Sequence, residues 1–520
     1  MTDAIRQPNV LFIITDQHRA DHVGFNGNAV VQTPNLDSIA ERGTVFDSCW
    51  VSNPVCMPNR STIVTGRMPS AHGVIGNDRS LDWGANTWIR QFQQAGYRTG
   101  LLGKSHLQNG VSRLTLTGFT EPPAVNDPHP AGWNEFEFEE LYESGALEWP
   151  EDFYGFDTVE LSLDHGANVA GHHLLWALER GAKREDLVVP QTAENPKRRG
   201  SDAWWQVYEP PYDEEFHSSS FVADRTINFI EEATAQGSPW VAWASFPDPH
   251  HPFTPPGQWY DRHSADDMEL PATFDDPLEG APKYLKRFQS RTVHDMRQWV
   301  DVIGATSPEV TRAAIAANYG TIEMIDDRVG QIRDAIERLG QTDDTIVVFT
   351  SDHGDMLGDH GLILKGLMHY RGTLQVPLVI ADPRRNAART TSLASSIDLG
   401  PTLMDLCSVD GYHGIQGHSL APILDDPAAA VRDHVLVEDD IDINFGGLVP
   451  ARTRTLVTAT HRYTRHSTGE EGLYELGTQD DERTNLAAAE TTLRNEMVDR
   501  LTGSLLNHSD AARGVYPTAM

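Results

Sequence analysis

The sequence predicts an α/β protein with a large, mainly parallel sheet sandwiched by helices, and a small C-terminal subdomain with a short antiparallel sheet. Three observations support this prediction. Apolar runs of strand length alternate with segments of helix length, which is typical of a parallel sheet covered on both faces. Several of these runs lead directly into a polar residue. Beyond Pro401 the alternation stops, and short strand-like runs follow one another.

Each predicted element has its own signal. Strands are predicted at apolar, β-branched runs, and helices where a start signal such as proline is followed by a glycine stop. The predicted strands are Val10–Thr15, Thr99–Leu102, Trp240–Phe246, Ile346–Thr350, Arg454–Thr458, His461–Thr464 and Gly472–Leu476. The predicted helices are Asn35–Arg42, Pro58–Thr65, Thr87–Ala95 and Pro308–Leu339.

The length of the chain predicts two units. A chain of 520 residues is too long for one small domain and suits a large domain with a smaller one. We assign residues 1–430 to the large α/β domain and residues 431–520 to the C-terminal α+β subdomain. Residues 110–216 are less regular and rich in tryptophan, proline and acidic residues. We interpret this segment as an insertion that shapes a binding pocket or contacts another subunit, which would make the protein a homo-oligomer.

Composition narrows the classes of partner and the compartment. With a formal net charge of -34 the surface repels phosphate backbones, so nucleic-acid binding is not expected. An anionic small molecule would need local cations and a metal ion at its site. No apolar run approaches the roughly 18 residues of a membrane helix, so no membrane association is expected. The N-terminus lacks the apolar core of a secretory signal, and the 3 cysteines are sparse and odd in number, which predicts a cytoplasmic location.

Four polar residues occupy equivalent places in the predicted sheet. Asp16, Lys104, His250 and Asp352 each lie just past the carboxyl end of a predicted strand. Ligands of open α/β sheets bind at this edge. The sequence therefore predicts that the four side chains converge on one site.

Cys56 begins a short predicted helix, and Arg60 follows four residues later on the same helical face. A helix N-terminus offers free N–H groups and partial positive charge, and a guanidinium adds a fork of donors. This turn could hold a tetrahedral anion against a cysteine nucleophile. A buried structural cysteine beside a helix-capping proline is the alternative that the motif alone leaves open.

Residues 56–60 (CMPNR), followed by residues 65–67 (TGR), resemble the signature of the type I sulfatases, the formylglycine-dependent family of the alkaline phosphatase superfamily. Asn59 departs from the family pattern, where serine is common. Further segments resemble family elements in the same order along nearly the whole chain. They are residues 9–17 (NVLFIITDQ), 33–37 (TPNLD), 96–100 (GYRTG), 103–107 (GKSHL), 249–253 (PHHPF), 350–354 (TSDHG), 358–361 (GDHG), 365–366 (KG), 473–476 (LYEL) and 485–486 (NL).

The resemblance implies an alkaline phosphatase-like fold and a modified cysteine. In that family a maturation enzyme that reads C-x-P-x-R oxidises the cysteine to formylglycine. The aldehyde hydrates, one hydroxyl attacks sulfur, and the other helps to expel sulfate. For this chain the resemblance implies that Cys56 becomes the nucleophile and that the maturation enzyme is a partner.

The resemblance also implies one divalent metal ion. Its ligands would be Asp16, Gln17, Asp352 and His353, with the modified residue 56 as a further ligand. Many sulfatases have aspartate and asparagine at the second and fourth of these positions. The Gln17 and His353 pair is more similar to choline sulfatases and phosphonate monoester hydrolases. Calcium (Ca2+) is favoured from the family, and Mn2+ follows closely because an imidazole suits it.

The remaining family positions surround the substrate. Lys104, His106, His250 and Lys365 would neutralise the anion and protonate the leaving group, and which histidine is the acid stays open. His250 is chosen over the adjacent His251 from the H-x-P register, and His251 is interpreted as a loop side chain. Asn77 is a weaker candidate for substrate contact.

These inferences predict hydrolysis of aryl or alkyl sulfate monoesters. The first alternative is a phosphonate monoester or phosphodiester hydrolase on the same scaffold, with promiscuity between sulfate and phosphate esters. Gln17 and His353 favour it, and Lys104 and His106 disfavour it. A second is a non-catalytic anion-binding member of the fold. A third, a zinc phosphatase with serine or threonine as nucleophile, is opposed by Cys56 in its oxidation motif.

Overall fold

The computed structural model describes residues 7–77, 79–110, 129, 131–145, 147–150, 152–188, 193–194, 196–293, 304–440, 452–478 and 482–507. Within these residues the main feature is a nine-stranded sheet in the order β14-β2-β13-β11-β1-β9-β4-β5-β6. Its central strands β11, β1, β9, β4 and β5 are parallel neighbours, whereas β13 and β6 run antiparallel to theirs. The strands are β1 (Asn9–Thr15), β2 (Thr44–Phe46), β4 (Arg98–Gly103), β5 (Thr158–Leu163), β6 (Ala170–Gly171), β9 (Trp240–Ser245), β11 (Thr345–Ser351), β13 (Leu378–Ala381) and β14 (Ala388–Thr390).

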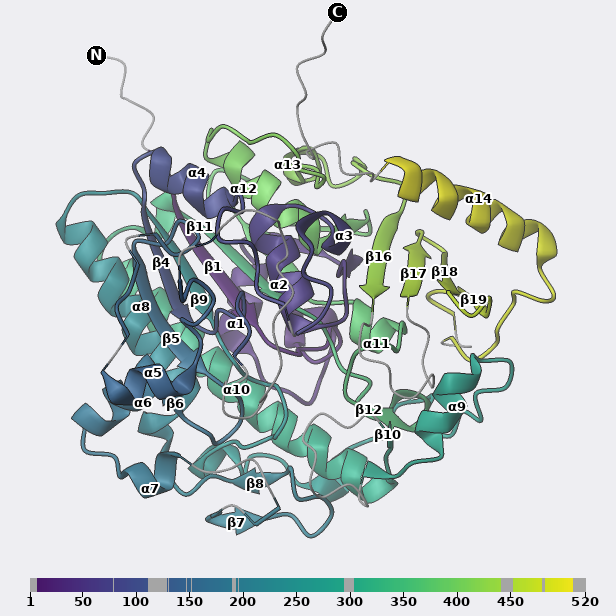
Figure 1. The fold of residues 1–520 in the computed structure, drawn as a ribbon, viewed down its shortest axis with the longest axis horizontal. Coiled ribbons are helices and arrows are strands. Elements are labelled where there is room, and N and C mark those ends of the chain that lie inside the picture. The colour runs from purple at the N-terminus through teal and green to yellow at the C-terminus, as the bar shows by residue number, and fades with distance from the viewer. Residues whose placement is uncertain are drawn as a thin grey trace, which may run out of the picture.

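Helices cover both faces of this sheet (Figure 1). Helices α1, α8 and α10 pack on one face, and α2, α4 and α12 lie on the other. The helices are α1 (Pro34–Ala40), α2 (Cys56–Thr65), α3 (Pro69–His72), α4 (Trp88–Gln94), α5 (Glu139–Ser144), α6 (His172–Glu179), α7 (Arg184–Leu187), α8 (Ser218–Ala235), α9 (Lys283–Gln289), α10 (Pro308–Arg338), α11 (Arg371–Leu374), α12 (Leu399–Leu406), α13 (Ala421–Asp425) and α14 (Thr491–Asn507).

Strand β1 shows why helices cover both faces of the sheet. All seven of its residues are buried. Because successive strand side chains point to opposite faces, Phe12 packs with α4 residue Trp88 while Leu11 and Ile13 belong to the core beneath α8 and α10. A strand that is apolar on both faces is the signature of a parallel sheet between two helical layers. The predicted architecture is therefore confirmed.

A second sheet of four antiparallel strands lies beside the large one, with α14 across its upper end (Figure 1). Its order is β16-β17-β18-β19, and the strands are β16 (Val435–Asp440), β17 (Arg452–Val457), β18 (His461–His466) and β19 (Glu471–Glu475). The last three match the predicted antiparallel strands, which confirms the predicted small C-terminal sheet. Strand β16 was not predicted, because its run ends in acidic residues.

Short two-stranded pieces complete the fold. They are β3 (Cys49–Trp50) with β15 (Ala394–Ser395), β7 (Arg199–Gly200) with β8 (Tyr208–Glu209), and β10 (Gly304–Ala305) with β12 (Leu362–Ile363). The predicted insertion 110–216 contributes β5 and β6 to the central sheet, so part of it belongs to the main fold. Its residues 111–128 lie outside the described residues. None of the helices in the described ranges is both long and apolar enough to cross a membrane.

Candidate active site

Four neighbouring strands of the central sheet place their carboxyl ends together. Strands β11, β1, β9 and β4 stand side by side and lead to Asp352, Asp16, His250 and Lys104. All four side chains are buried, with exposed fractions of 0%, 0%, 3% and 5%. Groups that lie far apart in the sequence thus meet at the sheet edge where α/β proteins bind ligands.

Cys56 is the first residue of α2 and faces this edge. Its Sγ lies 3.1 Å from His353 Nε2, 3.2 Å from Lys365 Nζ and 3.7 Å from Asp16 Oδ1. Burial and Asp16 raise the pKa of the thiol, but Lys365, Lys104 and His353 outweigh them and lower it to about 7. A thiolate at neutral pH is a nucleophile and a metal ligand, so residue 56 has a reactive environment.

Arg60 contacts the ends of four neighbouring strands, β11, β9, β4 and β1. Its Nε donates to Asp352 Oδ2 at 2.6 Å, and its Nη1 donates to Ser245 Oγ at 2.9 Å and to the Lys104 carbonyl at 3.1 Å. Its Nη2 lies 3.7 Å from Asp16 Oδ2. With no exposure, the guanidinium neutralises two buried carboxylates that would otherwise repel each other. In the structure Arg60 thus contacts the carboxylates of the candidate metal cluster, and its predicted contact with an anion stays a prediction.

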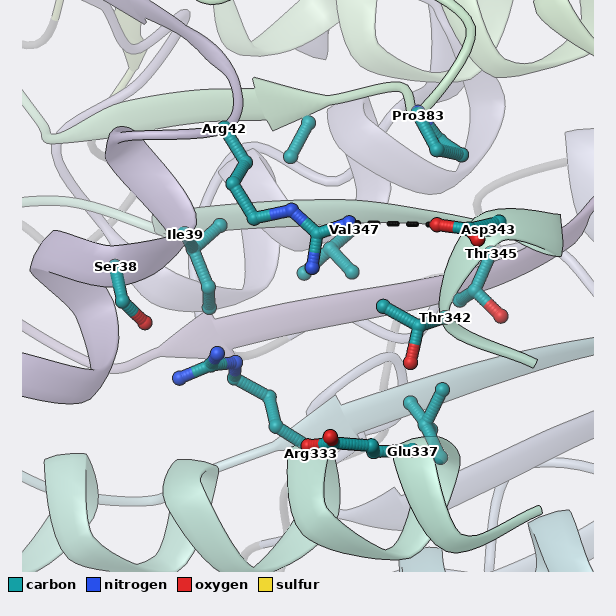
Figure 2. Close-up of a pocket in the computed structure, with 12 residues that line it drawn as sticks. Ser38, Ile39, Arg42, Arg333, Glu337, Thr342, Asp343, Thr345, Val347 and Pro383 are labelled. Carbon is teal, nitrogen blue, oxygen red and sulfur yellow. Dashed lines mark ion pairs between the residues drawn. The ribbon is translucent and has the colours of Figure 1, made fainter. Parts of the chain in front are cut away.

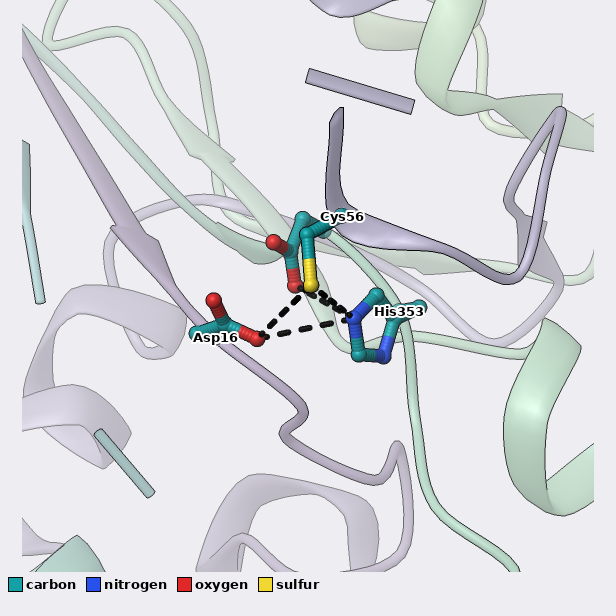
Figure 3. A group of neighbouring side chains, drawn as sticks. Asp16, Cys56 and His353 are labelled. Atoms are coloured by element: carbon teal, nitrogen blue, oxygen red, sulfur yellow. Dashed lines mark hydrogen bonds and ion pairs between the residues drawn. The ribbon is translucent and has the colours of Figure 1, made fainter. Parts of the chain in front are cut away.

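Asp16, Cys56, Asp352 and His353 form a buried cluster that could hold a metal ion. Their ligand atoms all lie within 4.8 Å of one another, and Figure 3 shows Asp16 and His353 turned toward the sulfur. His353 Nε2 is 3.5 Å from Asp16 Oδ1 and 3.6 Å from Asp352 Oδ1. Burial lowers the pKa of His353, yet Asp352 and Cys56 raise it overall, which marks a place that attracts positive charge. Two carboxylates and an imidazole in a closed site fit a divalent cation.

Gln17 lies beside this cluster in a left-handed backbone conformation, with φ at 63°. Its backbone N–H donates to Asp352 Oδ1 at 3.1 Å. Its side-chain Oε1 accepts from Lys365 Nζ at 2.8 Å, and its Nε2 contacts Asp355 Oδ2 and His251 Nδ1. His251 does lie in a loop, as predicted, but it is fully buried there and contacts Gln17.

Cations and imidazoles form the opposite wall. Lys104 Nζ bonds to Asp16 Oδ2 and to His165 Nε2, and Lys365 Nζ bonds to His250 Nε2. The His165 and His250 rings are stacked with centroids 3.8 Å apart. Burial raises the pKa of Asp16, but Lys104, His250 and Lys365 outweigh it and hold that pKa well below its ordinary value. The wall therefore carries the local positive charge that an anion needs within this acidic protein.

His106 lies at the edge of this wall, with its ring centroid 6.2 Å from that of His165. Among the described residues its Nδ1 is buried without a hydrogen-bond partner. Burial, followed by the charge of Lys104, lowers its pKa well below the ordinary value. Asn77 Oδ1 accepts from the Met57 N–H at 3.1 Å and so caps the start of α2, while its predicted contact with substrate stays a prediction.

A cavity of about 430 Å³ opens in front of Cys56. Its lining combines lysine and histidine side chains with three acidic residues. Its lining residues are Cys56, Asn77, Lys104, His106, Gly110, Glu137, Glu139, Ser162, Leu163, Asp164, His165, His250 and Lys365. The predicted candidates Cys56, Asn77, Lys104, His106, His250 and Lys365 thus share one cavity.

His165 is a site residue that the sequence did not reveal. It follows the carboxyl end of β5, as Lys104 follows β4, so the strand-end rule would have found it. Strand β5 was missed because its sequence, TVELSL, is only half apolar and lies in an otherwise irregular segment. Asp164, beside His165, accepts from the His165 backbone N–H at 2.8 Å and helps to fix its position.

A metal-binding cluster and a cationic wall that face one cysteine suit the cleavage of an anionic ester. Fold and site together fit a hydrolase of anionic esters with room for a divalent metal ion. Sequence comparison gives the family: residues 8–409 match the sulfatase family, and the chain belongs to it. Residues 358–503 also match the C-terminal region of N-sulphoglucosamine sulphohydrolase.

Individual relatives are distant but cover nearly the full chain. The arylsulfatase of Clostridium perfringens is 26% identical over 519 residues, which are 98% of this chain and 96% of that protein. The choline-sulfatase of Rhizobium meliloti is 25% identical, covering 92% of this chain and 82% of that protein. The crystal structure of the phosphonate monoester hydrolase of Agrobacterium radiobacter is 25% identical, with a TM-score of 0.77 and 96% of both chains covered.

Proposed function

We propose that the protein hydrolyses aryl or alkyl sulfate monoesters with a formylglycine nucleophile made from Cys56. The observation that carries this proposal is the position of Cys56 Sγ. It lies 3.1 Å from His353 in the metal-binding cluster and 3.2 Å from Lys365 in the cationic wall. A nucleophile in this place would meet a sulfate group held between a metal ion and two lysines. Family membership supports the same reading.

Within this proposal the metal ion lies against Asp16, Gln17, Asp352, His353 and residue 56. It would supply positive charge to the sulfate oxygens and to the nucleophile. Carboxylate and carboxamide oxygens suit Ca2+, which we propose as the resident ion, and the imidazole of His353 makes Mn2+ the next candidate.

The chain's own groups would do the rest of the work. Lys104 and Lys365 would neutralise the sulfate oxygens, because both ammonium groups line the cavity beside Cys56. His250, His106 and the additional His165 line the same cavity, so each is within reach of a leaving-group oxygen. We expect His250→Ala to lower turnover of alkyl sulfates more than that of nitrophenyl sulfate, because an alkoxide needs a proton more than a phenoxide does.

Mass spectrometry tests the modification directly. In active enzyme produced together with a maturation enzyme, Cys56 should have lost about 18 Da as thiol becomes aldehyde. The cysteines Cys49 and Cys407 serve as internal controls in the same digest, since both are buried outside the cavity. Fully active enzyme with an unmodified Cys56 thiol would overturn the mechanism. Metal content measured on the same sample decides between calcium and manganese.

The second candidate is hydrolysis of phosphonate monoesters or phosphodiesters. It is favoured by the Gln17 and His353 pair and by the likeness to the phosphonate monoester hydrolase of Agrobacterium radiobacter. Lys104 and His106 speak against it, because we expect the G-K-x-H-L element, residues 103–107 here, to be altered in phosphonate hydrolases. Parallel kinetics on nitrophenyl sulfate and phenyl phenylphosphonate separate the two. A kcat/KM that is orders of magnitude higher on the phosphonate would reverse our order.

The proposal also includes a compartment and two partners. All 3 cysteines are free and buried, which supports a reducing compartment such as the cytoplasm. The maturation enzyme and a small-molecule ester are the partners that the proposal requires. Self-association of the protein stays a prediction.

A further inference from the structure

Lys365 reaches the site from an irregular loop between β12 and α11. Three residues around it have positive φ: Leu364 at 74°, Gly366 at 76° and Leu367 at 50°. A left-handed conformation at a non-glycine residue is strained and persists only where the surroundings fix it. The loop therefore needs specific contacts that hold it in the conformation that presents Lys365.

On the side before Lys365, the buried carboxylate of Asp355 supplies such contacts. Its Oδ1 accepts from the Leu364 N–H at 2.8 Å, and its Oδ2 bonds to Gln17. One end of the loop is thus tied directly to a predicted metal ligand.

On the side after Lys365, the contact comes from the C-terminal sheet. Asp439 of β16 accepts from the Leu367 N–H through Oδ2 at 3.2 Å, and the same oxygen lies 3.2 Å from His369 Nε2. His369 Nδ1 in turn lies 2.8 Å from Thr455 Oγ1 on β17. Figure 1 shows the end of β16 beside α11, which directly follows this loop.

This contact is buried. Asp439 and His369 are each 2% exposed, and Thr455 is fully buried. A carboxylate in such surroundings is stable only with its partners in place, so the loop and the sheet depend on each other. The carbonyl of Leu367 also accepts from the Tyr284 hydroxyl at 2.7 Å, so Leu367 is held on both sides.

We propose that Asp439, together with His369, is a positioning residue for Lys365, so that the C-terminal sheet sets the geometry of the nucleophile's cationic partner. The proposal rests on the proposed function, in which Lys365 contacts the anionic group of the substrate. Lys365 Nζ stands 3.2 Å from Cys56 Sγ and 2.8 Å from Gln17 Oε1. A displacement of about 1 Å at such a group can lower turnover by about 10²-fold.

A double-mutant cycle tests the proposal. Asp439→Ala should lower kcat by at least about tenfold in the otherwise unchanged enzyme, but by less than about twofold in a Lys365→Ala background, because it acts through Lys365. Asp440→Ala is the matched control: it removes a carboxylate from the next position of β16, where the partner is Arg454. Equal losses in both backgrounds, or no loss in the first, would overturn the proposal.

A milder variant covers the case in which Asp439→Ala does not fold. Tyr284→Phe removes only the hydroxyl that bonds to the Leu367 carbonyl. We expect a several-fold lower kcat that vanishes in the Lys365→Ala background, with thermal unfolding followed in parallel. A fall in kcat that is the same in both backgrounds would show that the loop acts on general stability instead.

Binding of inorganic sulfate separates this proposal from the proposed function. In titration calorimetry Lys365→Ala should weaken sulfate binding, and Asp439→Ala should weaken it only while Lys365 is present. This result can be obtained even if sulfate esters are not the substrate. Unchanged sulfate affinity in Asp439→Ala would contradict the positioning role, whatever ester the enzyme prefers.

Discussion

The two ends of β11 lie at two hollows whose charged side chains differ in burial. At its carboxyl end is the active-site cavity of about 430 Å³, and near its first residue, Thr345, is a groove of about 350 Å³ (Figure 2). Both contain arginine and acidic groups. At the carboxyl end Arg60 and Asp352 are fully buried and 2.6 Å apart. In the groove the side chains of Arg42 and Asp343 are 52% and 94% exposed and 3.6 Å apart.

The difference shows why only one hollow is a candidate for chemistry. Buried charges interact strongly and cannot be relieved by water, so each must be held by a partner of opposite charge. Exposed pairs contribute little, because water and salt screen them. The groove in Figure 2 is lined by apolar side chains such as Ile39 and Val347 together with charged ones such as Arg42.

The largest expected effect is at the nucleophile. Cys56→Ala should abolish turnover, because it removes the group that becomes formylglycine, while the circular dichroism spectrum stays unchanged. Ser38→Ala, at the wall of the groove, is the control and should keep full activity. Turnover by Cys56→Ala above background would contradict the assignment of the active site to the cavity at the carboxyl end of β11.

A direct comparison of the two hollows is the loss of activity and stability in Arg60→Ala and in Arg42→Ala. Loss of Arg60 leaves Asp352 and Asp16 without their buried partner, so we expect kcat/KM to fall by about 10²–10³-fold and unfolding free energy to fall by about 3–5 kcal/mol. Loss of the exposed Arg42 should change unfolding free energy by less than about 1 kcal/mol. Kinetics and urea unfolding of both variants provide the measurement. Similar effects at the two arginines would contradict the comparison.

Thiol chemistry distinguishes Cys56 from a cysteine outside the cavity. In protein made without the maturation enzyme, iodoacetamide should modify Cys56 with a rate that reaches half its maximum near pH 7, following its lowered pKa. Burial raises the pKa of Cys407 to about 12, so this cysteine should stay unmodified below pH 9. Peptide mapping after timed alkylation measures both. Faster labelling of Cys407 would refute the assignment of the reactive site.

The smallest expected effect is on thermal stability, at Glu139, which is one of the acidic residues that line the cavity. Burial, followed by Asp164, Glu140 and Glu143, raises the pKa of Glu139 from 4.5 to about 7. Because the unfolded chain releases this proton near pH 4.5 and the folded protein only near pH 7, stability is lost as pH rises from about 4.5 to about 7. Glu139→Gln should therefore leave Tm unchanged at pH 4.5 and raise it at pH 8. The exposed Glu179 offers a control substitution that should be neutral at both values, and a Tm gain at pH 4.5 would contradict the assignment.

Much of the sheet could be predicted because a strand that is apolar on both faces is recognisable from its own sequence. The predicted bounds of β1, β4, β9 and β11 agree with the structure within one residue or two. The residues that follow their carboxyl ends identified Asp16, Lys104, His250 and Asp352 as site candidates. Strands with charged faces were missed: β5 and β16 each carry acidic residues, and their burial depends on neighbours distant in the chain.

The side-chain roles were harder to predict than the positions. Nothing local to Asn77 reveals that it caps α2, or local to Arg60 that it binds two carboxylates. These roles depend on which segments meet in space. Likewise His251 contacts Gln17 because the loops after β9 and β1 approach each other, and the H-x-P register alone favoured only its neighbour.

The complete burial of α2 limits how long Cys56 stays accessible to another protein, although a small reagent can still reach it through the cavity. All ten residues of the helix are enclosed, and Cys56 is 1% exposed. The groups that enclose its sulfur, His353 and Lys365, lie about 300 residues further along the chain, so a ribosome adding ~5–20 residues per second reaches them about 15–60 s later. Any enzyme that oxidises Cys56 must act within that interval or on an unfolded chain. A fast-folding or slowly matured chain would then be trapped with an unmodified thiol.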